Sequence, residues 1–195
     1  LKKINKLDIP LATETPLRNS NFKAKEFNLL GTDGKYYSFS DIKGKNGTLV
    51  MFICNHCPYV KAIMSKIVKD TNELREYGIN SIAIMPNDTN TYKEDSYDNM
   101  QIFADTYKFH FPYVIDKTQE VAYAYQAVCT PDFFGFNKDL KLQYRGRIDS
   151  AVMNNNESNI SRELFDAMIK IKNEGTGPIK QFNSFGCSIK WKINE

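Results

Sequence analysis

The sequence predicts an α/β fold with a central mixed sheet flanked by helices. Two continuous apolar runs, Thr48–Ile53 and Ile79–Met85, are typical of strands buried on both faces. Between them, Pro58–Tyr77 carries apolar residues at helical spacing, so this part of the chain alternates strand, helix and strand. Near the C-terminal end, Phe133–Phe136 and Lys141–Ile148 are joined by a short turn, which predicts an antiparallel edge of the sheet.

The segment before the first buried strand predicts an extended arm and a hairpin. Residues 1–21 are polar and interrupted by proline, so we expect an arm without regular packing of its own. Two short apolar stretches, Phe27–Leu30 and Lys35–Phe39, flank Asp33-Gly34, a pair that favours a tight turn. Ser40-Asp41 is typical of the start of a short helical turn.

The rest of the chain adds further strand and helix signals to this frame. The predicted elements are a polar loop at Asn87–Asp95, a helix from an N-cap at Ser96 to Tyr107, a strand at Phe111–Ile115, a helix at Thr118–Ala127 and a last helix at Ser161–Asn173 that Gly175 ends. We therefore expect one domain over residues 22–175, preceded by the arm 1–21 and followed by a C-terminal tail, 176–195, that packs on the domain.

Composition excludes several classes of protein. The chain has 195 residues, of which 42% are hydrophobic and 25% charged, as in ordinary globular proteins. Basic and acidic residues nearly balance, and the formal net charge of +3 is too small to predict nucleic-acid or membrane binding. No apolar window approaches the roughly 18 residues of a transmembrane helix. Four cysteines are too few for a disulfide scaffold. We expect no cofactor, no nucleic-acid partner and no membrane span, with a cytoplasmic location and a monomer or weak homodimer.

The motif Cys54-Asn55-His56-Cys57 lies between a predicted buried strand and a predicted helix. The N-terminus of a helix stabilises an anion, and thiols in such motifs have pKa values of roughly 3.5–7.5 instead of about 8.5. We expect Cys54 to be the exposed attacking thiol with a lowered pKa, and Cys57 to be the resolving thiol. A protonated His56 would stabilise the Cys54 thiolate further. The motif thus predicts thiol–disulfide exchange.

A metal site is the alternative interpretation of this pair, besides two inert cysteines. Structural zinc usually requires a second CxxC or an HxxxH pair, and the sequence has neither. A copper chaperone of the Sco type would need a CxxxC spacing and a distant histidine. No metal ligand is therefore assigned, and a metal-binding module or redox-controlled adaptor stays as the non-enzymatic alternative.

The other two cysteines and one proline are further candidates. Thr130-Pro131 precedes a predicted strand, where a proline is awkward unless its peptide bond is special, for example cis. Cys129 is two residues before Pro131 and is either a third redox thiol or a small buried apolar residue. Cys187 lies in the tail, and a disulfide or transient pair with Cys129 is open.

The order of these features resembles the thioredoxin fold. The stretches that carry the likeness are FICNHCPYVK, FPYVIDKTQEVAYAY, CTPDFFGF, LQYRGRIDS and GCSIKWK. The N-terminal hairpin and the inserted strand-helix unit between Ser96 and Ala127 are similar to those of the AhpC/TSA (redoxin, peroxiredoxin-like) family and its TlpA/ResA-like relatives, over residues 22–192. The resemblance implies a role in cell redox homeostasis or antioxidant activity, with protein or small-molecule disulfides and thiols as substrates and an upstream thiol reductant. It also implies that Pro131 is a cis-proline facing the disulfide and that Thr130 docks substrate backbone.

The sequence departs from the thioredoxin pattern next to the motif. Thioredoxins have a buried Asp six residues before the first Cys, where this chain has Thr48, and Ile53 stands in place of their Trp. Asp132 either replaces the missing acid or is a surface or strand-end carboxylate. His56 resembles the histidine of DsbA-type oxidants, which implies a couple more oxidising than thioredoxin.

The sequence also departs from the peroxiredoxin pattern, Pro-x-x-x-Thr/Ser-x-x-Cys with an Arg on a later strand. Aligned on Cys57, the Thr position holds Cys54 and the Pro position holds Val50. No arginine occurs between Arg75 and Arg145, so we expect none beside Pro131. A thiol-dependent peroxidase that uses Cys57 is therefore an alternative to disulfide exchange.

Overall fold

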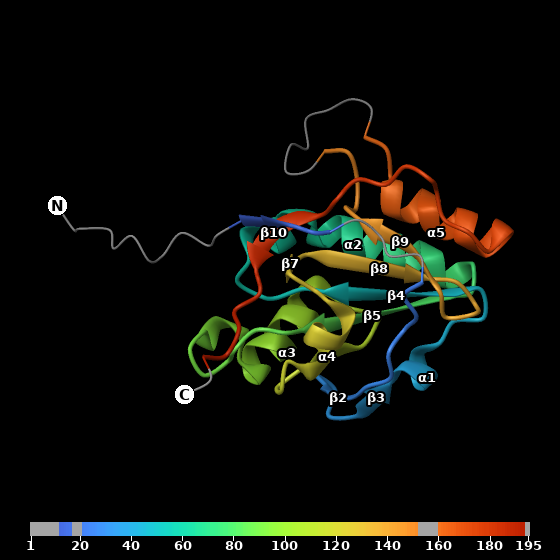
Figure 1. The fold of residues 1–195 in the computed structure, drawn as a ribbon. Helices are drawn as coiled ribbons and strands as arrows, with labels where there is room; N and C mark the ends of the chain where they lie inside the picture. The colour runs from blue at the N-terminus through green and yellow to red at the C-terminus, as the bar shows by residue number, and fades with distance from the viewer. Residues whose placement is uncertain (1–11, 17–20, 152–159, 194–195) are drawn as a thin grey trace.

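A mixed seven-stranded sheet forms the centre of the computed structural model, which describes residues 12–16, 21–151 and 160–193 (Figure 1). The strand order is β3-β2-β6-β5-β4-β8-β9. Their bounds are β2 Asn28–Gly31, β3 Tyr36–Ser38, β4 Gly47–Phe52, β5 Ile79–Met85, β6 Tyr113–Ile115, β8 Asp132–Phe136 and β9 Leu142–Gly146. Strands β4, β5 and β6 are parallel, and the other pairings are antiparallel. The predicted α/β fold is confirmed.

Strand β4 is buried along its whole length because both faces of the sheet are covered. Side chains of a strand alternate between the two faces, so Leu49 and Met51 belong to one apolar core while Val50 and Phe52 belong to the other. Its parallel neighbour β5 divides its side chains in the same way. A continuous apolar run is what such a two-sided environment requires.

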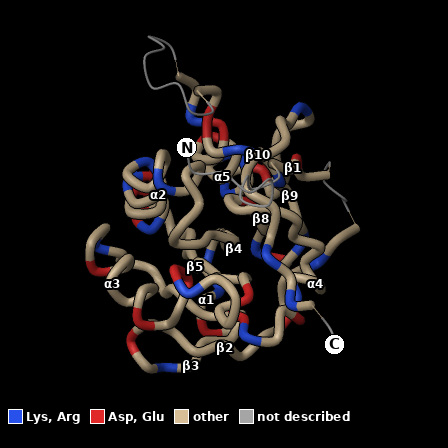
Figure 2. Tube along the Cα trace, turned by 90° about the vertical axis from the view of Figure 1, so that its left-hand side faces the viewer, with Lys and Arg blue, Asp and Glu red and all other residues tan. Residues whose placement is uncertain are grey.

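Helices cover both faces of the sheet (Figure 1). Helices α2 (Pro58–Glu76), α3 (Tyr97–Tyr107) and α5 (Glu163–Glu174) pack on one core, and α1 (Phe39–Ile42) and α4 (Glu120–Tyr125) pack on the other. A 3₁₀ turn at Lys93–Asp95 precedes α3. None of the helices in the described ranges is long and apolar enough to cross a membrane. Lysine and arginine are interspersed with aspartate and glutamate along the fold (Figure 2).

The predicted hairpin is present as the antiparallel pair β2–β3, whose turn contains Gly34 with a positive φ. The short helical turn after it begins one residue earlier than expected. Ser38 caps α1 by accepting a hydrogen bond from the backbone N–H of Asp41, while the Asp41 carboxylate accepts one from the Ser38 N–H. This reciprocal capping box sets where the helix starts.

A second, three-stranded sheet was not predicted, and it pairs strand β1 from the N-terminal part of the chain with strand β10 from the C-terminal part (Figure 1). Strand β10 (Phe185–Ser188) lies between β1 (Ala12–Glu14) and β7 (Cys129–Thr130), antiparallel to both. Gly186 permits this pairing, because a Cβ there would lie 2.1 Å from the Thr130 carbonyl oxygen. Much of the predicted arm, residues 1–11 and 17–20, is outside the described residues, and the division into arm, domain and tail stays a prediction.

Candidate active site

The CxxC motif connects the C-terminal end of β4 to the N-terminus of α2. Helix α2 begins at Pro58, so Cys57 is its N-cap residue and Cys54 lies farther back, next to the end of the strand. Proline is favoured at the first position of a helix, which explains this start. Both cysteines are free thiols with 0% exposure. The prediction that Cys54 is exposed is therefore wrong.

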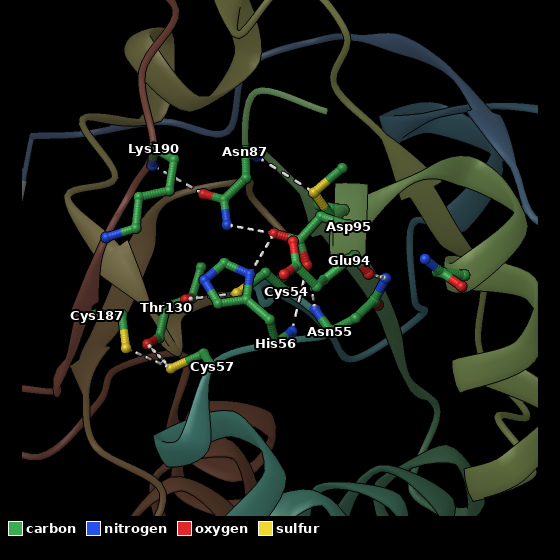
Figure 3. A network of polar contacts seen from close by, with 12 residues as sticks. Cys54, Asn55, His56, Cys57, Asn87, Glu94, Asp95, Thr130, Cys187 and Lys190 are labelled. Atoms are coloured by element: carbon green, nitrogen blue, oxygen red, sulfur yellow. Dashed lines mark hydrogen bonds and ion pairs between the residues drawn. The ribbon is translucent and has the colours of Figure 1, made fainter. Parts of the chain in front are cut away.

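Cys57 is the acidic thiol of the pair. In its thiol form its Sγ donates to the Thr130 carbonyl oxygen at 3.2 Å and lies 3.1 Å from the Sγ of Cys187 (Figure 3). A hydrogen bond from the Cys54 thiol, with further ones from Cys187 and the backbone N–H of Val60 in the first turn of α2, lowers the pKa of Cys57 to about 5. The anion-stabilising end of the helix thus acts on Cys57.

Cys54 has the opposite electrostatic environment. Burial raises the pKa of Cys54 well above its ordinary value, and the neighbouring Cys57 and the charge of Asp95 raise it further. Its Sγ lies 3.2 Å from the hydroxyl oxygen of Thr130, which partly offsets these effects. The predicted lowering of the Cys54 pKa is wrong because burial raises it, and helix α2 begins only at Pro58, four residues after Cys54.

A buried carboxylate holds the loop between the two cysteines. Asp95 is fully buried, and one of its oxygens accepts from the backbone N–H groups of Asn55 (2.8 Å) and His56 (3.3 Å). The other oxygen is 2.7 Å from His56 Nδ1 and accepts from Asn87 Nδ2 at 2.8 Å (Figure 3). The contact with Asp95 raises the pKa of His56, which favours the imidazolium beside the thiols.

Sequence reasoning missed Asp95, which it assigned to a polar loop. The signal available was position, since that loop follows β5 at the carboxyl end of a parallel strand, where sites in α/β folds are built. Asn55 also anchors the motif, because its side-chain amide donates to the Glu94 carbonyl at 3.1 Å and its side-chain oxygen accepts from Tyr113 at 2.9 Å. The motif is therefore fixed by contacts on both sides.

One cluster in the described part of the chain offers metal-ligand atoms. Atoms of Cys54, His56 and Asp95 lie within 4.8 Å of one another. The Asp95 carboxylate already accepts from four donor groups, two of them backbone N–H groups of the motif. A metal ion at this cluster would displace hydrogen bonds that hold the CxxC loop. The surrounding N–H groups therefore serve to hold the Asp95 carboxylate, and its oxygens are not left open for a cation.

Thr130 and Pro131 face the motif as the resemblance implied. The peptide bond between them is cis, and Thr130 contacts both motif sulfurs, Cys54 through its hydroxyl and Cys57 through its carbonyl. A cavity of about 260 Å³ lies next to Pro131, bordered by Tyr59 of α2 and Phe185 of β10 among others.

Cys129 is next to Thr130, and the contact of its sulfur is with the backbone of Pro131. It is buried, its Sγ lies 3.6 Å from the Pro131 carbonyl oxygen, and burial raises its pKa. On β10, Ser188 lies opposite Cys129, and Cys187 lies opposite Thr130. The Sγ of Cys187 contacts Cys57, so the structure does not favour a pair between Cys129 and Cys187.

The structure decides one alternative about charge near Pro131 and corrects one expectation. Asp132 is the first residue of β8, so it is a strand-end carboxylate, but it is fully buried and not at the surface, and burial raises its pKa to about 6. The expectation that no arginine lies beside Pro131 is wrong. Arg145 lies beside Asp132, with Nη2 2.8 Å and Nε 3.3 Å from the carboxylate oxygens, because pairing of β8 with β9 brings position 145 opposite Phe134. Arg145 also donates to the Gln126 carbonyl and packs on the Phe134 ring, on the sheet face opposite the CxxC thiols.

Comparisons with known proteins agree with this fold. The AhpC/TSA family model matches residues 21–145. A conserved protein from Geobacillus kaustophilus is similar over 94% of this chain and 98% of its own, with 40% identity and a TM-score of 0.89. A hypothetical protein from Sinorhizobium meliloti 1021 is 30% identical, with a TM-score of 0.87 over 93% of this chain and 100% of its own.

A more distant likeness is in fold alone. The thioredoxin domain of a thiol-disulfide oxidoreductase from Bacteroides vulgatus is 15% identical and gives a TM-score of 0.58, over 71% of this chain and 95% of its own. No curated protein matches the chain.

Proposed function

The chain belongs to the AhpC/TSA family, and on this premise we propose that it is a thiol–disulfide oxidoreductase that exchanges disulfides through Cys54 and Cys57. The observation that carries the proposal is the Cys57 thiol at the N-terminus of α2, whose pKa the neighbouring Cys54 thiol lowers. A thiolate is the attacking species in disulfide exchange, and a pKa of about 5 makes Cys57 a thiolate at neutral pH.

The roles of the two cysteines follow from their surroundings and are the reverse of the sequence expectation. The Cys57 thiolate attacks one sulfur of a substrate disulfide and releases the other as a thiolate, forming a mixed disulfide. Cys54 then attacks Cys57, which forms the Cys54–Cys57 disulfide and frees the second substrate thiol. Two electrons pass from the protein dithiol to the substrate disulfide.

Deprotonation of Cys54 becomes easier after the first step. The Cys57 thiolate is one of the groups that raise the pKa of Cys54, and its negative charge is lost when it bonds to substrate sulfur. The hydroxyl of Thr130, 3.2 Å from Cys54 Sγ, is placed to donate to the Cys54 thiolate. The imidazolium of His56, held by Asp95, adds a positive charge beside the pair.

The same electrostatics imply whether the Cys54–Cys57 pair tends to oxidise or to reduce its substrates. A low thiol pKa stabilises the reduced form, so we expect a reduction potential less negative than the roughly −270 mV of thioredoxin. Run in the opposite direction from the steps above, the exchange would then make disulfides in substrate thiols more readily than it breaks them. The protein would be left as a dithiol, and an upstream disulfide would reoxidise it.

Variants of two buried cysteines test the proposal. Cys57→Ser should abolish reduction of insulin disulfides in the presence of dithiothreitol. Cys129→Ser is the matched control, because Cys129 is also buried but its Sγ contacts the Pro131 carbonyl and not the motif. Wild-type activity in Cys57→Ser, or equal losses in both variants, would contradict the assignment.

A thiol-dependent peroxidase is the second candidate, because an acidic Cys57 also suits attack on a peroxide oxygen. Arg145 gives this candidate no support, since its hydrogen bonds are directed to Asp132 and Gln126. Rapid peroxide consumption coupled to a thiol donor and lost in Cys57→Ser would favour it over disulfide exchange.

A further inference from the structure

Cys187 lies at the proposed site although it is 130 residues from Cys57 in the sequence. The two Sγ atoms are 3.1 Å apart, and Cys57 therefore has one cysteine neighbour within its motif and a second one on β10 (Figure 3). Cys187 is 1% exposed, so solvent does not separate the two sulfurs. Neither the CxxC motif nor the matched family region, residues 21–145, includes this residue.

We propose that Cys187 is a third redox-active thiol and forms a disulfide with Cys57, an inference that rests on the proposed attack by Cys57. A disulfide bond is about 2.05 Å long, so the sulfurs need to approach by about 1 Å.

The position of Cys187 is fixed by the backbone around it. Strand β10 is the central strand of its sheet, with Cys187 opposite Ala12 of β1 on one side and Thr130 of β7 on the other. Gly186 allows the close approach to the Thr130 carbonyl. The sulfur contact is therefore a product of two strand pairings.

The segment after β10 is tied to the opposite side of the site. The backbone N–H of Lys190 donates to Asn87 Oδ1 at 2.9 Å, and the same amide group donates to Asp95 (Figure 3). The carboxylate that holds the CxxC loop thus shares a partner with the chain that carries Cys187. Both partners of the proposed disulfide are anchored in one hydrogen-bonded network.

The chemistry requires a disulfide oxidant, for which oxidised glutathione is a suitable probe. The Cys57 thiolate attacks one glutathione sulfur, breaking the S–S bond and releasing one glutathione thiolate. The Cys187 sulfur then attacks Cys57 Sγ, the bond between Cys57 and glutathione breaks, and the second glutathione leaves with the proton of Cys187. The protein loses two electrons and gains one disulfide, and the oxidant becomes two thiols.

The consequence is that Cys57 is shared between two mutually exclusive disulfides. Cys54 gives a local bridge within the motif, whereas Cys187 gives a bridge that joins α2 to β10. Because β10 covers the side of β7 next to the cis-proline, the second bridge locks the strand over the site. Oxidation through Cys187 would thus add a covalent link between α2 and β10, whereas the first bridge leaves β10 held by its pairings with β1 and β7 alone.

The test oxidises the whole protein with glutathione, blocks free thiols, digests it without reduction and identifies the linked peptides by mass spectrometry. In wild-type protein we expect a Cys57–Cys187 peptide pair. In Cys54→Ser we expect that pair as the main product, with loss of two of the three remaining thiols. Cys54→Ser/Cys187→Ser should form no internal disulfide, and Cys129→Ser should behave like wild type.

The outcomes separate this inference from the proposed function. A Cys54–Cys57 disulfide in wild type, with no Cys57–Cys187 link in wild type or Cys54→Ser, would overturn the inference and leave the proposed function standing. Absence of every internal disulfide that includes Cys57 would contradict both. A link between Cys129 and Cys187 in place of Cys57–Cys187 would also overturn the inference.

Discussion

The stability gained on oxidation should depend strongly on which cysteine bonds to Cys57. In Cys54→Ser the only expected bridge joins positions 57 and 187 and closes a loop across 130 residues. In Cys187→Ser the expected bridge is within the motif and closes a loop of about four residues. The entropy that each bridge removes from the unfolded chain grows with the logarithm of loop length.

The difference between the two bridges is large enough to measure. The loop-closure relation gives about 5 kcal/mol for the long loop and about 2 kcal/mol for the short one at 25 °C, a difference of about 3 kcal/mol. Strain in the folded state subtracts from either value, so these figures are upper values. Each oxidised variant is compared with its own reduced form, which removes the effect of the serine substitution itself.

Urea unfolding followed by circular dichroism measures this difference, with the bridge verified by mass spectrometry in each sample. We expect the midpoint to rise on oxidation in both variants and to rise more in Cys54→Ser. Equal gains in the two variants, or a larger gain in Cys187→Ser, would refute the reasoning that β10 is bonded to α2 across the long loop.

Three further predictions concern the surroundings of the thiols. The ultraviolet absorbance of the thiolate should titrate with a midpoint near the Cys57 pKa of about 5. Because the folded state lowers this pKa, the Cys57 thiolate stabilises the fold fully above the pKa of the unfolded thiol, and this stabilisation is lost as the pH falls through the folded midpoint. A transition that survives in Cys57→Ser would assign the absorbance change to another group. Asp95→Asn should lower the free energy of unfolding by roughly 2–3 kcal/mol, because an amide NH₂ group replaces a carboxylate oxygen that accepts from buried donors. Glu94→Gln, at the exposed neighbouring position, should have little effect. Equal changes in the urea midpoints of the two variants would refute the role of Asp95 in holding the CxxC loop. Gly186→Ala should reduce the yield of the long-range disulfide severalfold, because a Cβ would lie 2.1 Å from a carbonyl oxygen of β7, and an unchanged yield in a quantitative peptide map would contradict the proposed strand contact.

The parts of the fold that sequence predicted well are those with local signals. The run Ile79–Met85 coincides with β5 because a strand covered on both faces needs apolar residues at every position. Ser96 was expected as an N-cap, and its side chain does accept from the Asn99 N–H at the start of α3. Such signals lie within the segment that they describe.

The roles of the two motif thiols, attacking and resolving, were predicted the wrong way round for a local reason. The sequence interpretation began the helix at Pro58, as the structure does, but assigned the stabilised thiolate to Cys54 and not to Cys57, the N-cap residue of α2. Proline at the first helical position is a known start signal, so the correct order was within reach of the sequence. As a result, the stabilised thiolate is assigned to Cys57 and not to Cys54.

The rest of the site depends on contacts between distant segments. Strand β10 is four residues long and contains Gly186, so it has no strand signal of its own and exists because β1 and β7 lie on either side. Asp95 is 40 residues from the backbone N–H of Asn55 that it accepts from, and Cys187 is 130 residues from Cys57. No periodicity or spacing in a single sequence indicates such pairings.

The attacking role of Cys57 is decided by finding which sulfur first carries a substrate group. Two reduced double variants, Cys54→Ser/Cys187→Ser and Cys57→Ser/Cys187→Ser, are mixed with a limiting amount of oxidised glutathione at neutral pH, and the rate of mixed-disulfide formation is measured by intact mass. Because Cys57 is acidic and the pKa of Cys54 is raised, the variant that keeps Cys57 should be modified much faster. Equal rates, or faster modification of the variant that keeps Cys54, would contradict the assignment of Cys57 as the nucleophile.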